Sequence, residues 1–90
     1  MKRTEHASQS IRDAATKAHR DGDKVTAARL YQRVIATEGE VSAIIFANYG
    51  ALLREQQRPK EAAVVYRRGL KIFPKELILL RNYANLLLQE

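Results

Sequence analysis

The stretch that decides the fold is residues 46–74, FANYGALLREQQRPKEAAVVYRRGLKIFP. Both of its halves place apolar or small residues every three or four positions, which is the period of an α-helix. Pro59 suits the first turn of a second helix, where its missing N–H costs nothing. Pro74 ends that helix because proline cannot continue the hydrogen-bond ladder. The stretch therefore predicts a helical hairpin.

The chain repeats this hairpin. Residues 27–33 and 62–68 align at an offset of 35 and share two alanines, a tyrosine and an arginine. Residues 48–53 and 82–87 align at an offset of 34, with four of six residues identical. Two matches with nearly equal offsets predict copies of one structural unit.

We expect an all-α fold made of two helical hairpins and one additional helix, which pack side by side through small-residue contacts at Gly50, Ala62 and Ala84. Asp23 and Ser42 are good N-caps for the second and third helices, and no segment alternates as a strand does. Helix ends are defined to within about 2–4 residues. The expected helices are residues 5–20, 24–37, 42–56, 59–72 and 75–89.

The second hairpin carries a recognisable signature: Phe46-x-x-Tyr49-Gly50-x-x-Leu53, then Ala62, Tyr66 and the closing Pro74. This pattern resembles the tetratricopeptide repeat family, which has Trp, Leu, Gly and Tyr in the first helix and Ala and an aromatic in the second. The resemblance implies a right-handed solenoid of antiparallel helices in one domain, residues 1–90. Its repeats would be about 8–41 and 43–76, with a half repeat at 77–90.

The composition of the chain excludes several classes of protein function. The 90 residues include 16 Lys+Arg, 10 Asp+Glu and no cysteine. This length excludes a multi-step enzyme with its own cofactor domain, and the lack of cysteine excludes disulfide frameworks and thiol nucleophiles. The longest apolar runs have five residues, against about 20 needed to cross a membrane. The N-terminus lacks the apolar stretch of a secretory signal, so we expect a cytoplasmic protein without a membrane segment.

No catalytic or metal-binding constellation is present in the sequence. His6 and His19 are its only imidazoles, and no nucleophile, base and orienting group can be assembled around them. His19 and Asp23 are spaced as a two-ligand pair, but a structural metal site needs four ligands. We expect no enzyme activity, no metal and no cofactor.

The resemblance implies that the first helix of each hairpin lines a concave groove for an extended peptide. Asn48 and Asn82 would lie one above the other, each able to donate to and accept from a peptide backbone, and the arginines would favour acidic partners. Arg12 and Asn48 match the carboxylate clamp of some family members, whereas Thr16, Ile78 and Asn82 depart from it. The implied groove residues are Arg12, Thr16, His19, Arg20, Asn48, Ala51, Arg54, Arg81, Asn82 and Asn85.

The last expected helix has apolar residues on several sides, which is typical of a helix that becomes buried. We therefore expect residues 1–90 to be the N-terminal part of a longer chain, or the last helix to form a homodimer. The predicted self-association residues are Leu77, Leu79, Leu86 and Leu88.

Three functions follow from these patterns. A non-catalytic scaffold that binds a protein or peptide is the preferred one. A dimerisation arm of a larger enzyme, such as a transferase, is the alternative that the resemblance suggests. Single-stranded RNA binding is disfavoured because stacking aromatics are absent from the expected groove. The basic positions of the second helices are interpreted as a solvated surface: Arg29, Arg33, Arg67, Arg68 and Lys71.

Overall fold

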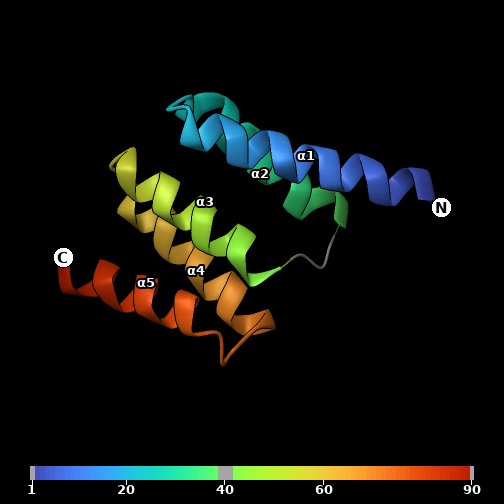
Figure 1. Ribbon diagram of the computed structural model, residues 1–90. Helices are drawn as coiled ribbons and strands as arrows, with labels where there is room; N and C mark the ends of the chain where they lie inside the picture. The colour runs from blue at the N-terminus through green and yellow to red at the C-terminus, as the bar shows by residue number, and fades with distance from the viewer. Residues whose placement is uncertain (1, 39–41, 90) are drawn as a thin grey trace. The chain divides into compact units, whose positions relative to one another are not determined.

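A computed structural model describes residues 2–38 and 42–89, with side chains for residues 11–36 and 42–89 (Figure 1). These residues form five α-helices and, within the described ranges, no strand, which confirms the predicted all-α fold. The largest differences from the expected ends are a start of the first helix three residues earlier and a start of the last helix two residues later. The helices are α1 Lys2–Arg20, α2 Lys24–Glu38, α3 Ala43–Glu55, α4 Pro59–Ile72 and α5 Leu77–Gln89.

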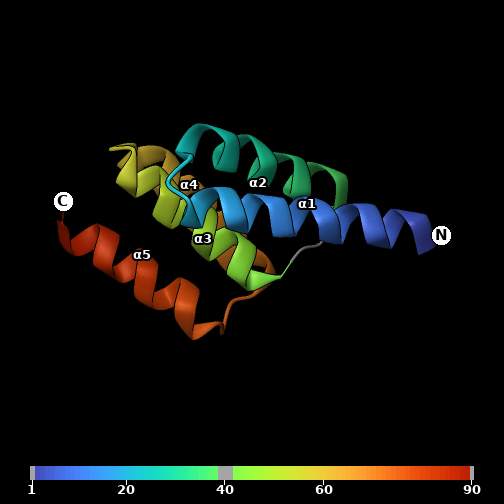
Figure 2. The ribbon, with the colours of Figure 1, turned by 45° about the horizontal axis from the view of Figure 1, so that its top comes forward.

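The chain divides into two compact units, Met1–Val41 with α1 and α2, and Ser42–Glu90 with α3, α4 and α5. We call them the first unit and the second unit. In the first unit, α1 and α2 pack side by side in both views (Figures 1 and 2). In the second unit, α3 contacts α4, and α5 contacts both. The division falls between the predicted first and second repeats.

The turn between α1 and α2 follows the chemistry of its residues. Gly22 adopts a φ of +86°, a left-handed conformation that glycine tolerates because it has no Cβ. Asp23 precedes the first residue of α2, and its Oδ1 accepts a hydrogen bond from the Thr26 amide at 3.3 Å. Asp23 is therefore the N-cap that the sequence predicted. Ala15, Ala18, Ala27, Tyr31 and Val34 are the buried side chains nearest this turn on the two helices.

The hairpin of α3 and α4 is built on glycine at two crossing points. A Cβ at Gly50 of α3 would overlap ring atoms of Tyr66 on α4. A Cβ at Gly69 of α4 would lie 2.8 Å from Phe46 Cβ and 3.1 Å from Leu79 Cδ1. The absence of these two β-carbons lets three helices approach closely, since helix separation is set by the side chains at the contact.

The predicted ends of α4 are confirmed. Pro59 is its first residue and Glu61 lies in its first turn, where a negative charge favours the helix dipole. The helix ends at Ile72, two residues before Pro74. Ser42 precedes α3 in extended conformation but makes no side-chain capping bond, so it holds the N-cap position without the hydrogen bond expected of it.

One packing expectation is wrong. The repeat pattern assigns Ala84 of α5 to a close helix crossing because it corresponds to Gly50. Ala84 is instead exposed. The reason is that no helix of the second unit covers this side of α5, whereas α4 covers the corresponding side of α3.

Candidate functional site

The predicted groove residues of the first unit lie along α1 and its C-terminal turn. Thr16 is exposed and donates its hydroxyl to the Arg12 carbonyl at 3.0 Å. His19 is half-buried; its Nδ1 lies 3.1 Å from the Tyr31 hydroxyl, and the two rings meet edge to face. Arg20 is exposed. His19 therefore takes part in packing α1 on α2, a role that the sequence pattern did not predict for it.

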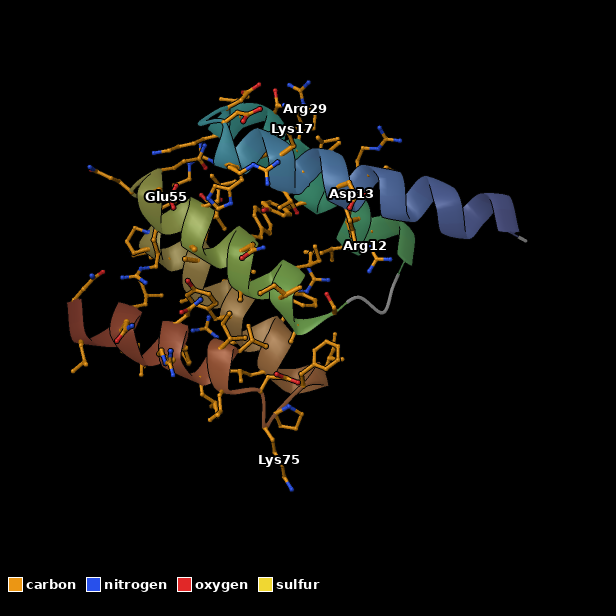
Figure 3. The ribbon with its side chains drawn as sticks, in the orientation of Figure 1. Arg12, Asp13, Lys17, Arg29, Glu55 and Lys75 are labelled. Atoms are coloured by element: carbon orange, nitrogen blue, oxygen red, sulfur yellow. The ribbon has the colours of Figure 1, made fainter. Side chains whose placement is uncertain are left out.

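Electrostatic contacts in the first unit are local. Lys17 and Asp21 form an ion pair of 2.7 Å across one helical turn, with both side chains exposed. The hydrogen bond from Lys17, together with its charge, lowers the pKa of the Asp21 carboxyl. Lys17 of α1 and Arg29 of α2 are labelled in Figure 3. An exposed pair of this kind contributes little to stability. The pair balances charge locally and does not indicate a binding site.

The predicted groove residues of the second unit all lie on α3 and α5, which pack against each other. Each of them retains solvent exposure, so the two contacting helices present an accessible polar surface. On α3, Asn48, Ala51 and Arg54 are half-buried; on α5, Asn82 is half-buried and Arg81 and Asn85 are exposed.

Arg54 links the two helices of this surface. Its Nη2 donates to Gln89 Oε1 of α5 at 2.5 Å. Its Nε is buried without a hydrogen-bond partner among the described residues, as is the Tyr66 hydroxyl of α4. Burial raises the pKa of the Tyr66 hydroxyl, and the adjacent Arg54, first as a hydrogen-bonding neighbour and then through its charge, offsets part of that rise. Arg54 therefore occupies the point where α3, α4 and α5 meet, with donor capacity that the described chain does not fully use.

An open pocket of about 370 Å³ lies at this point. Among the described residues that line it, none carries a carboxylate and Arg54 is the one charged group. Gln57 contributes to the wall from the turn between α3 and α4, where it has a φ of +61° and its amide donates to the Arg54 carbonyl at 2.9 Å. The lining residues are Arg54, Gln57, Pro59, Leu86 and Gln89.

Of the pocket residues, Arg54 was expected in the groove, whereas Gln57, Pro59 and Leu86 were not predicted to line a site. The expected helices 42–56 and 59–72 left residues 57 and 58 as the connection between them. A left-handed residue at position 57 is not predictable from a glutamine, so no signal in the sequence pointed to this wall of the pocket.

The pocket has the chemistry of a recognition site. A guanidinium binds a carboxylate through parallel charge-assisted hydrogen bonds, and the two glutamine amides can donate to and accept from a peptide backbone. In the part of the chain that the structure describes, no group of three His, Cys, Asp or Glu is placed to hold a metal ion. None of the described helices is both long enough and apolar enough to cross a membrane.

The predicted self-association residues separate into two pairs. Leu77 and Leu88 are exposed, with 71% and 84% of their surface accessible. Leu79 and Leu86 are buried, and a Cβ at Gly69 would lie 3.1 Å from Leu79 Cδ1. The prediction is therefore wrong for Leu79 and Leu86 as surface residues, because that side of α5 packs inside the second unit.

The outer surface of α4 also contacts α5. Arg67 donates through Nη1 to the Tyr83 hydroxyl at 3.3 Å, and the Tyr66 and Tyr83 rings lie 6.3 Å apart. Arg67, which the sequence assigned to a solvated basic surface, is exposed and also makes a hydrogen bond to α5.

Comparison with protein families agrees with this geometry. The family described as Tetratricopeptide repeat matches residues 43–86, from the first residue of α3 into α5. The match over this segment supports assignment to the tetratricopeptide repeat family. Tetratricopeptide repeats generally mediate protein–protein interactions and typically form non-catalytic scaffolds. None of the curated proteins matches the chain.

Proposed function

We propose that this tetratricopeptide repeat protein binds an extended acidic peptide along α3 and α5 of its second unit. The pocket at Arg54 would receive a carboxylate of the peptide. The observation that supports the proposal is the Arg54 guanidinium in a pocket whose lining, among the described residues, includes two amides and no acidic side chain.

The neighbouring surface suits a peptide backbone. Asn48 and Asn82 lie on the two contacting helices and are half-buried, so each keeps an accessible amide on a side chain that packing partly restrains. An amide has both donors and an acceptor, the combination that an extended main chain requires. Arg81 and Asn85 are exposed on α5 and extend the polar surface.

The charge of the pocket also favours anionic ligands over cationic ones. Arg54 is partly held by Gln89, so its guanidinium is oriented before a ligand arrives, and less side-chain entropy is lost on binding. A carboxylate gains from this arrangement, whereas a cationic side chain is repelled. Protein or peptide partners with acidic segments are therefore favoured.

The test uses a fluorescein-labelled peptide of twelve residues, alternating glutamate and alanine, with a free C-terminal carboxylate. A second peptide replaces every glutamate by glutamine, and a third has an amidated C-terminus. Fluorescence anisotropy at low salt is expected to show tighter binding of the glutamate peptide than of the glutamine peptide. The amidated peptide shows whether a terminal or a side-chain carboxylate occupies the pocket. Equal binding of the glutamate and glutamine peptides would contradict the proposal.

Arg54→Gln is expected to weaken binding of the glutamate peptide about tenfold or more, in line with the loss of a charge-assisted hydrogen bond. Arg68→Gln is the matched control, because Arg68 is exposed on α4 and its removal changes the net charge equally. Circular dichroism of both variants verifies that helicity is unchanged. If the two variants weaken binding equally, attraction by overall charge explains the affinity and the pocket has no special role.

A further inference from the structure

The turn between α1 and α2 is closed by a Schellman motif. The Gly22 amide donates to the His19 carbonyl at 3.1 Å. The Asp23 amide donates to the Ala18 carbonyl at 2.9 Å. This pair of bonds requires one residue in the left-handed conformation, and that residue is usually glycine because glycine has no Cβ. Gly22, with its φ of +86°, is that residue in the first unit.

The turn between α3 and α4 has the same hydrogen bonds 35 residues later, at the offset of the internal repeat. The Gln57 amide donates to the Arg54 carbonyl at 2.9 Å, and the Arg58 amide donates to the Leu53 carbonyl at 2.8 Å. Gln57 has a φ of +61° and is, in the ranges that the structure describes, the only residue other than glycine with a positive φ. The second hairpin therefore has glutamine at the position where the first has glycine.

The backbone of this motif disfavours a side chain at the left-handed position. In that conformation a Cβ lies too close to the following carbonyl oxygen, and residues held in this way are concentrated at functional sites. Space does not explain why the two turns differ, since a Cβ at Gly22 would meet no atom within 4 Å. Glycine is thus the better residue for both turns, and the turn itself does not account for the glutamine at position 57.

The glutamine contributes to the pocket beside Arg54. Gln57 is exposed and is one of the residues that line this pocket. The amide oxygen of Gln89, on another wall, already accepts a hydrogen bond from Arg54. Gln57 supplies the second amide of the lining, with two N–H donors and a carbonyl acceptor. Glycine at position 57 would relieve the backbone and remove this amide from the pocket.

We propose that Gln57 determines the specificity of this pocket by recognising the peptide main chain beside the bound carboxylate, an inference that rests on the proposed function. Arg54 binds the carboxylate. The Gln57 side chain accepts a hydrogen bond from the adjoining main-chain N–H and donates one to a main-chain carbonyl. Because an amide is uncharged, it adds no attraction for the anion as a whole. Its donor and acceptor match a peptide link, so the pocket selects a carboxylate carried by a peptide over a small acid such as acetate.

Thermal denaturation followed by circular dichroism tests whether the glutamine is costly to the turn. Gln57→Gly is expected to raise the Tm by about 4–8 °C, because it removes the strain of a left-handed side chain. Gly22→Gln introduces the same strain in the first unit and should lower the Tm by a similar amount. A Tm of Gln57→Gly at or below that of the wild type would overturn the inference, since stability would then explain the glutamine.

Fluorescence anisotropy with the fluorescein-labelled glutamate peptide tests the role in the pocket. Gln57→Gly and Gln57→Ala are both expected to weaken binding about three- to tenfold, the effect of losing a neutral hydrogen bond. Gln57→Ala keeps a Cβ at the left-handed position, so it separates loss of the amide from the greater flexibility of glycine. Gly22→Gln is the matched control and should leave binding unchanged, because the proposed site lies in the second unit. Wild-type affinity of Gln57→Ala would overturn the inference.

A glutamate peptide that is N-methylated along its backbone shows whether Gln57 contacts the main chain. Methylation removes the N–H groups, so it should weaken binding to the wild type more than binding to Gln57→Ala, which has already lost the acceptor. Equal weakening of the two proteins would overturn recognition of the main chain by Gln57.

These measurements distinguish failure of this inference from failure of the proposed function. If the wild type binds the glutamate and glutamine peptides equally, the pocket is not a carboxylate site and both proposals are wrong. If the wild type prefers the glutamate peptide and Gln57→Ala binds it with the same affinity, the proposed function stands and only the role of Gln57 is wrong.

Discussion

The ring of Tyr66 lies in the space that a β-carbon of Gly50 would need. This contact joins α3 to α4, and Tyr66 is fully buried as a result. An alanine at position 50, although a better helix former, would displace the largest side chain at the centre of the second unit. The glycine of the repeat signature is therefore a packing requirement, since its place in mid-helix carries a propensity cost.

Gly50→Ala is expected to destabilise the chain by about 1–3 kcal/mol, the usual cost of overpacking a core. Urea denaturation followed by circular dichroism measures the change. Helix propensity alone would stabilise the variant by roughly 0.5–1 kcal/mol, so the sign of the change separates the two effects. In a double-mutant cycle, Tyr66→Leu should remove most of the penalty; additive effects would show that the overlap with Tyr66 is not its cause.

Removing the hydroxyls of two buried tyrosines should have different consequences. The Tyr31 hydroxyl is hydrogen-bonded to His19, so Tyr31→Phe should cost about 1 kcal/mol. The Tyr66 hydroxyl is buried without a partner among the described residues, so Tyr66→Phe should be neutral or stabilising by up to about 1 kcal/mol. Thermal denaturation of the two variants measures the change in stability that each substitution causes. A loss of stability in Tyr66→Phe as large as that in Tyr31→Phe would indicate a hydrogen bond from Arg54.

Alkaline pH should destabilise the second unit through Tyr66. Burial raises the pKa of its hydroxyl above the ordinary tyrosine value of 10.0, so the unfolded chain loses this proton at a lower pH than the folded chain does. The free energy of unfolding therefore falls once the pH exceeds about 10, and it continues to fall until the pKa of the folded state is reached. Urea denaturation at several pH values should show a shallower fall for Tyr66→Phe. Parallel pH dependences of the two proteins would contradict the assignment.

The two N-cap residues provide a matched pair. Asp23 makes a capping hydrogen bond to the Thr26 amide, whereas Ser42 makes none. Asp23→Ala is therefore expected to cost about 0.5–2 kcal/mol, and Ser42→Ala less than half of that. Chemical denaturation of both variants tests the difference. Equal losses would mean that the Ser42 hydroxyl does cap α3 in solution.

The helix boundaries were predictable because the residues that set them act locally. Asp23, Pro59 and Pro74 change the backbone within one turn of their own position, and α2 and α4 begin and end within one residue of the expected limits. The accessible polar surface of α3 and α5 was partly predictable, since the family resemblance implied Asn48, Arg54 and Asn82 as groove residues. The pocket beside Arg54 was not, because it depends on a left-handed Gln57 and on the approach of Gln89 from another helix.

Leucines 79 and 80 show where the sequence stops being informative. They are neighbours with the same side chain, and apolar periodicity marked both sides of α5. Leu79 is completely buried and Leu80 is 43% exposed. The sequence alone determined that this segment is an amphipathic helix of a repeat, since hydrogen bonding and period are properties of the local chain. Only the tertiary structure decided which side became core, because burial depends on helices that pack against it from elsewhere in the chain.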